Sequence, residues 1–143
     1  MKIKNKSALL SIIIFLISLF FTAFQVKDLG EIKSYSSGEL LIVGPLIFLG
    51  GGIMEFLVWT ANVWFLLSVF YSFRKKYLLS LVFGFISSSC SVSFIFWHNV
   101  LASENGRTAE IISLEKGYFL WFFSILCITF SSLYLKVTQK SNA

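Results

Sequence analysis

The chain has 143 residues, of which 57% are hydrophobic and 13% are charged. Soluble domains carry roughly 25% charged residues, and a soluble core of this size has no room for so much apolar surface, so a soluble globular protein is excluded. Disorder is excluded because disordered chains are poor in hydrophobic residues. Two cysteines and one histidine are too few for a zinc cluster, a thiol redox motif or a disulfide framework. The composition predicts an integral membrane protein.

Four apolar stretches are long enough to cross a bilayer, for which a helix needs about 20 residues. They cover about 8–24, 53–73, 77–97 and 117–135, and charged or turn residues bound each of them. Helices satisfy their own backbone hydrogen bonds in lipid. We therefore expect an all-α membrane protein, a four-transmembrane-helix bundle that forms one membrane domain over 1–143. Its outer loops would cover about 25–52 and 98–116.

Basic residues without acidic neighbours gather at one set of span ends. They are Lys2, Lys4, Lys6, Arg74, Lys75, Lys76, Lys136 and Lys140. The other two connections mix both signs of charge, so the positive-inside rule places both termini and the 74–76 turn in the cytoplasm. The net charge of +5 is then a signal of topology, and no nucleic-acid partner is expected. Bulky Phe21 stands where signal cleavage needs a small residue, which favours an uncleaved first span.

The segment before the second span is apolar but interrupted. Gly44-Pro45 and the glycines at 50–52 are breaker signals. Residues 40–52 form either a re-entrant piece, which must be covered by protein, or an element that lies on the surface. We favour the surface element, because re-entrant segments are rarer among runs this short.

Three polar or aromatic residues share one face at the start of the second span. Trp59 and Asn62 follow Glu55 at the fourth and seventh positions. An intramembrane carboxylate suggests a functional site, whereas a hydrated acid in the first helical turn is the simpler interpretation of Glu55. Asn62 lies deeper and is expected to hydrogen-bond a neighbouring helix.

Small residues recur at helical spacing along the third and fourth spans. In lipid such residues let helices approach closely. We expect helix packing at Gly84, Ser87, Ser88, Ser91 and Ser124. The dense serine run at 87–91 leaves a polar pathway open as the alternative.

The second outer loop begins at His98, which can titrate near neutral pH. Without a second histidine or a nearby cysteine, it does not indicate a metal site. Further along the loop, Asn105-Gly106 is a strong hairpin signal. The loop can therefore form a small hairpin that caps the helices.

No catalytic constellation is present in the sequence. It has no glycine-rich phosphate loop, no metal-ligating cluster and no nucleophile beside a base. We therefore expect neither an enzyme nor a bound cofactor.

Two short motifs carry a family resemblance. Trp59-Thr60-Ala61-Asn62 in the second span and Gly117-Tyr118-Phe119-Leu120-Trp121 at the start of the fourth resemble a group of small bacterial four-span membrane proteins of unassigned function. The resemblance covers spans two to four. It implies a helical bundle in the bacterial inner membrane and implies no activity.

Two functions fit these observations. The first is a non-enzymatic inner-membrane protein that binds a lipid or a membrane protein at its outer face, and it can also form a homo-oligomer. An immunity protein against a pore-forming toxin is one specific form. The alternative is a small transporter or channel that uses Glu55 and Asn62. The polar candidates for either function are Glu55, Trp59, Asn62 and His98.

Overall fold

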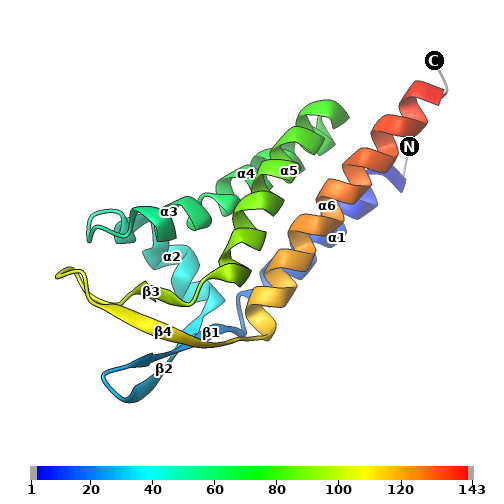
Figure 1. The fold of residues 1–143 in the computed structure, drawn as a ribbon. Coiled ribbons are helices and arrows are strands. Elements are labelled where there is room, and N and C mark those ends of the chain that lie inside the picture. Colours follow the sequence, from blue (N-terminus) through cyan, green and yellow to red (C-terminus); the bar gives the residue numbers. More distant parts are fainter. Residues whose placement is uncertain (1–2, 142–143) are drawn as a thin grey trace.

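The computed structural model describes residues 3–141, and side chains over 6–139. Its helices are α1 (Ile3–Ser18), α2 (Ser37–Ile47), α3 (Ile53–Trp59), α4 (Ala61–Phe73), α5 (Tyr77–Ser93), the short 3-10 helix η1 (Phe94–Phe96) and α6 (Lys116–Ser141). Its strands are β1 (Thr22–Asp28), β2 (Glu31–Ser36), β3 (Asn99–Leu101) and β4 (Thr108–Leu114). The strands lie across one end of the long helices (Figure 1).

The expectation of an all-α four-helix bundle is wrong. The two outer loops form one antiparallel sheet in the order β2-β1-β4-β3, so the fold is mixed α/β. The first apolar stretch contains both kinds of element, because α1 ends at Ser18 and β1 begins at Thr22. Phe24, the last residue of the expected first span, is a buried side chain of β1 rather than part of a helix. Composition alone could not separate these elements, since both are apolar.

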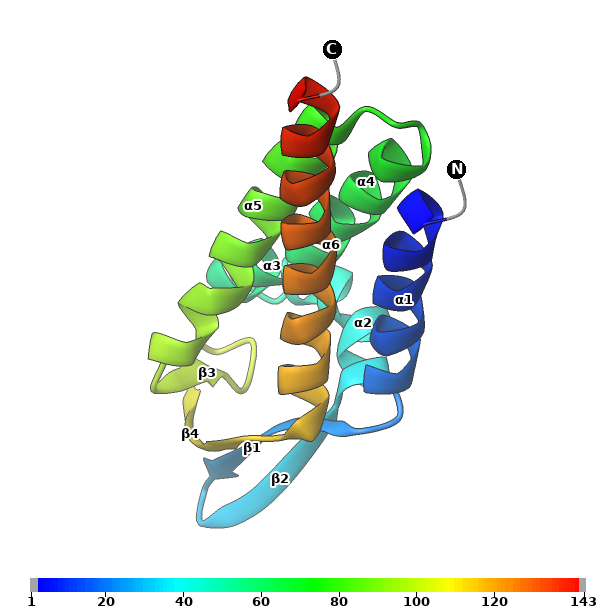
Figure 2. The ribbon, with the colours of Figure 1, turned by 90° about the vertical axis from the view of Figure 1, so that its right-hand side faces the viewer.

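Among the described residues, three helices have the length and apolar composition to cross a membrane. They cover Ile53–Phe73, Tyr77–Phe96 and Lys116–Gln139. The first expected span, 8–24, is shorter than expected, because the apolar helix of α1 covers Lys6–Ser18. It lies antiparallel beside α6 (Figure 1, Figure 2).

Both hairpins of the sheet turn at residues with positive φ. Leu29 (φ 51°) and Gly30 (φ 88°) join β1 to β2, which is the backbone conformation of a type I′ turn. Gly106 (φ 84°) lies in the hairpin between β3 and β4, where Asn105-Gly106 indicates one. Strand β1 also pairs with β4, with Lys27 opposite Glu110. This long-range pairing turns two local hairpins into one sheet.

Segment 40–52, expected either to re-enter the membrane or to lie on the surface, contains most of a helix and the turn that follows it. Residues 37–47 form α2, a helix that starts at the sheet and is capped by the Ser36 hydroxyl, which accepts from the Glu39 amide. The chain then turns at 48–52 and enters α3. One face of α2 contacts the interior, while Ile42 is 77% exposed on the other face.

Small residues lie where the long helices touch. Ser87 Oγ donates to the Ala61 carbonyl oxygen at 2.7 Å and joins α5 to α4. Ser88 Oγ lies 3.2 Å from Thr129 Oγ1 on α6, and Ser91 accepts at its carbonyl oxygen from the Tyr118 hydroxyl at 2.7 Å. Gly84 belongs to the same interfaces, and Ser124 of α6 is fully buried. Close helix contact and satisfied hydroxyl groups therefore occur together.

One buried carboxylate joins the two hairpins. Asp28 is 4% exposed at the end of β1, and Lys33 Nζ of β2 donates to its Oδ2 at 2.7 Å. Arg107, in the turn between β3 and β4, lies 3.3 Å from Oδ1. The Lys33 hydrogen bond, aided by the charge of Arg107, outweighs desolvation and lowers the pKa of Asp28 below its ordinary 3.8.

Replacing Gly84 by leucine should lower the free energy of unfolding by about 1–3 kcal/mol, the usual cost of overpacking. A Cβ at Gly84 would already lie 2.6 Å from Thr129 Oγ1 and 3.1 Å from Ser68 Oγ. The control Phe85→Leu changes the next residue, which is 67% exposed, and should change stability little. Thermal unfolding in one detergent compares them. Equal stability of the two variants would contradict close packing at Gly84.

Acid should weaken the sheet through Asp28. Its folded-state pKa lies below the unfolded value, so its stabilisation is present above the unfolded pKa and is lost as pH falls through the folded pKa. We expect Asp28→Asn to be less stable at neutral pH and to lose less stability than the wild type between about pH 5 and pH 2. Glu31→Gln is the control. Thermal unfolding at each pH decides, and identical acid profiles for Asp28→Asn and wild type would refute this role.

Candidate functional site

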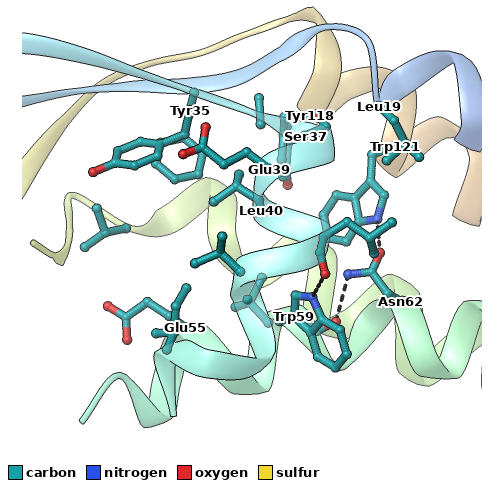
Figure 3. A pocket seen from close by; sticks show the side chains of 18 of the residues that line it. Leu19, Tyr35, Ser37, Glu39, Leu40, Glu55, Trp59, Asn62, Tyr118 and Trp121 are labelled. Atoms are coloured by element: carbon teal, nitrogen blue, oxygen red, sulfur yellow. Dashed lines mark hydrogen bonds between the residues drawn. The ribbon is translucent and has the colours of Figure 1, made fainter. Parts of the chain in front are cut away.

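A cavity of about 280 Å³ lies where the sheet meets the helices. Helix α2 covers it from one side, and β1, β2, β3, α3, α4 and α6 supply the other walls (Figure 3). Its lining is mostly apolar and includes the aromatic residues Phe24, Tyr35, Trp59, Tyr118 and Trp121. A cavity near 300 Å³ with apolar walls and a few polar groups is typical of a small-ligand site.

Helix α2 is held over the cavity by Trp59. In a regular helix the carbonyl oxygen of Leu41 accepts from the amide of residue 45, but Pro45 has no N–H. The indole Nε1 of Trp59 donates to that carbonyl oxygen instead, at 3.1 Å. Gly44 makes the approach possible, because a Cβ there would lie 2.0 Å from Trp59 Cδ1. Gly44 and Pro45 together form the surface that receives this indole.

Asn62 links two tryptophans of the cavity wall. Its Nδ2 donates to the Trp59 carbonyl oxygen at 2.9 Å, and its Oδ1 accepts from Trp121 Nε1 at 2.8 Å (Figure 3). In a regular helix Val63 N would donate to the Trp59 carbonyl oxygen. Here it donates to the Thr60 carbonyl oxygen instead, which leaves the Trp59 carbonyl oxygen available. The interhelical hydrogen bond expected of Asn62 is therefore made to α6, and both ends of its amide are satisfied.

Two glutamates lie on the cavity wall. Glu55 Oε1 accepts from the Leu101 amide at 2.8 Å, which connects α3 to the edge strand β3. Glu39 lies in the first turn of α2, where an acid is favoured by the helix dipole, and its side chain is exposed. These are the charged residues among those that line the cavity.

Three of the four polar residues singled out in the sequence meet at this cavity. Glu55, Trp59 and Asn62 all line it. His98 is separate: its side chain is exposed, it is not part of the lining, and its carbonyl oxygen accepts from Ile111 N. The described residues contain no group of three or more histidines, cysteines or acids that could hold a metal ion.

Sequence reasoning missed much of the wall. Trp121 and Tyr118 stood only in a motif of the family resemblance, and Tyr35 lay in an expected outer loop. Gly44-Pro45 was the available signal, because a proline inside a helix leaves a carbonyl oxygen that needs another donor. Finding that donor required the fold. Comparison with protein-family models, curated proteins and solved structures finds no match for this chain.

The Trp59–Leu41 hydrogen bond can be measured by a double-mutant cycle. Trp59→Phe should destabilise the protein by about 1–3 kcal/mol, because it leaves the Leu41 carbonyl oxygen without its donor. In a Pro45→Ala background the loss should be smaller, since alanine at this position restores the helical N–H. Thermal unfolding and hydrogen exchange over α2 are the measurements. Additive effects of the two substitutions would show that Trp59 does not replace the missing amide.

Proposed function

We propose that this chain is a non-enzymatic, multi-pass protein of a bacterial inner membrane that binds an apolar-chain ligand in the cavity beneath α2. The distribution of side chains supports the membrane. Hydroxyl groups of Ser68, Ser80 and Ser132 are fully buried and bonded to one another, while Phe85 is 67% and Phe130 63% exposed on the outside. Such a surface is costly in water and suited to lipid.

The charge pattern supports an orientation. The first turn of α1, the last turn of α6 and the α4–α5 turn lie at one end of the molecule, and the sheet lies at the other (Figure 2). Lys6, the basic run 74–76 and Lys136 lie toward the former end without acidic residues, whereas the basic residues at the sheet end are mixed with acids, which favours cytoplasmic termini. In this orientation the sheet, α2 and the cavity face outward.

The single observation that carries the binding proposal is the cavity itself. Its volume of about 280 Å³ suits one chain or a small amphiphile. A protein partner would need roughly 1,000 Å² of interface. The outer face of α2 and the turn after it expose Ile42 (77%), Leu46 (60%) and Leu49 (80%). This apolar surface beside the cavity favours a ligand that comes from the outer leaflet.

The alternative of a transporter or channel has less support. Glu55 and Asn62 were its proposed pathway residues, but Glu55 bonds to β3 at the sheet end and both amide atoms of Asn62 are occupied. The serine hydroxyls of the third span bond to helix backbones and neighbouring helices. These contacts fit packing better than a hydrated path.

Filling the cavity tests the proposal. Leu40→Trp adds bulk to a side chain of the wall, whereas Ile42→Trp adds the same bulk on the exposed face of α2. Native mass spectrometry would follow dodecanol binding to protein in nanodiscs of uncharged galactolipid. We expect saturable binding to the wild type, and about tenfold weaker binding to Leu40→Trp, which corresponds to about 1.4 kcal/mol.

The control should bind dodecanol like the wild type. Equal affinities of the Leu40→Trp and Ile42→Trp proteins would contradict a site beneath α2. Lack of saturable binding to the wild type would contradict the proposed function altogether.

A further inference from the structure

The cavity has a charged end and an apolar end. Glu39 and Glu55 lie at one end together with Tyr35, and Leu19 and Trp121 lie at the other (Figure 3). None of the described residues that line the cavity is a lysine or an arginine. The ion pairs among the described side chains are those of Asp28, so neither glutamate is neutralised by a basic partner there. This end of the cavity carries negative charge without a counterion from the described part of the chain.

A hydroxyl group also lies on the cavity wall. The Ser37 hydroxyl oxygen is buried and has no hydrogen-bond partner among the described residues. Buried polar atoms normally find a partner, because an unsatisfied one costs free energy. A polar group of a ligand would satisfy this hydroxyl, either as its donor or as its acceptor.

We propose that the ligand is a cationic amphiphile, with its ammonium head at Glu39 and Glu55 and its chain toward Trp121. This inference rests on the proposed function and adds the chemistry of the head group. Unlike charges attract most strongly away from bulk water, and the half-buried Glu55 is less screened than the exposed Glu39. The ring of Tyr35 can add a cation–π contact. An anionic head would be repelled by both carboxylates.

Three probes with the same chain and different heads test the inference. They are protonated dodecylamine, dodecanol and dodecanoate at neutral pH, with the same galactolipid nanodiscs and native mass spectrometry. We expect dodecylamine to bind about tenfold more tightly than dodecanol, a difference expected for one favourable charge interaction. Dodecanoate should bind most weakly. Added salt should reduce the preference for the amine.

Glutamine variants test whether the two glutamates cause the preference for dodecylamine over dodecanol. Glu55→Gln keeps an acceptor for the Leu101 amide, and the ratio of amine to alcohol affinity should fall toward one. Glu39→Gln should lower the ratio less, because its side chain is exposed. Glu31→Gln removes the same charge from β2, away from the cavity, and should keep the wild-type ratio. Alcohol binding by each variant reports whether its cavity is intact.

The outcomes separate this inference from the proposed function. Saturable binding of dodecanol with no preference for the amine would overturn the inference and leave the proposed function standing. If none of the three probes bound, both the inference and the proposed function would be overturned. A preference that survives in both glutamine variants would also refute the assignment.

A further arm distinguishes the source of the ammonium group. Phosphatidylethanolamine replaces part of the galactolipid, and dodecylamine is titrated again. Weaker apparent binding of dodecylamine would support the inference with a membrane lipid as the occupant. Unchanged binding would support it with a free amphiphilic amine.

Discussion

The hydrogen bond from Trp59 to the carbonyl oxygen of Leu41 holds α2 against the helices. Pro45 removes the helical donor, and Gly44 removes the side chain that would block the indole. The same tryptophan bonds through its carbonyl oxygen to Asn62, which in turn accepts from Trp121. The wall of the cavity is therefore one connected set of hydrogen bonds across α2, α3, α4 and α6.

The long helices are held together by a different kind of contact. Where apolar solvent gives helices no hydrophobic drive to associate, close contact and interhelical hydrogen bonds must hold them together. Gly84 allows close contact, and the serines of α5 are small and can bond across the interface, as Ser87 does to the Ala61 carbonyl oxygen. Many large apolar side chains, Phe85 and Phe130 among them, face outward, while Phe65, Ile125 and Ile128 are buried between the helices.

The sheet connects these two parts of the molecule. It holds β1 beside β4, and the chain passes from β4 directly into α6. Glu55 bonds to the edge strand β3, so α3 is tied to the sheet. The cavity lies at this junction, where apolar helices meet a sheet that carries charged side chains. An amphiphile has the same division between apolar chain and polar head.

Composition and local pattern were enough to predict the apolar character of the chain, three of its long helices, the hairpin at Asn105-Gly106 and the alignment of Glu55, Trp59 and Asn62 on one side. These features depend on composition or on neighbours within a few residues. The strands over 22–36 could not be predicted in this way, because the pairing of β1 with β4 joins residues about ninety positions apart. The fold also brought Trp121 to Asn62 and Trp59 to Leu41. Contacts of this kind depend on how elements meet in space, and no local pattern contains that information.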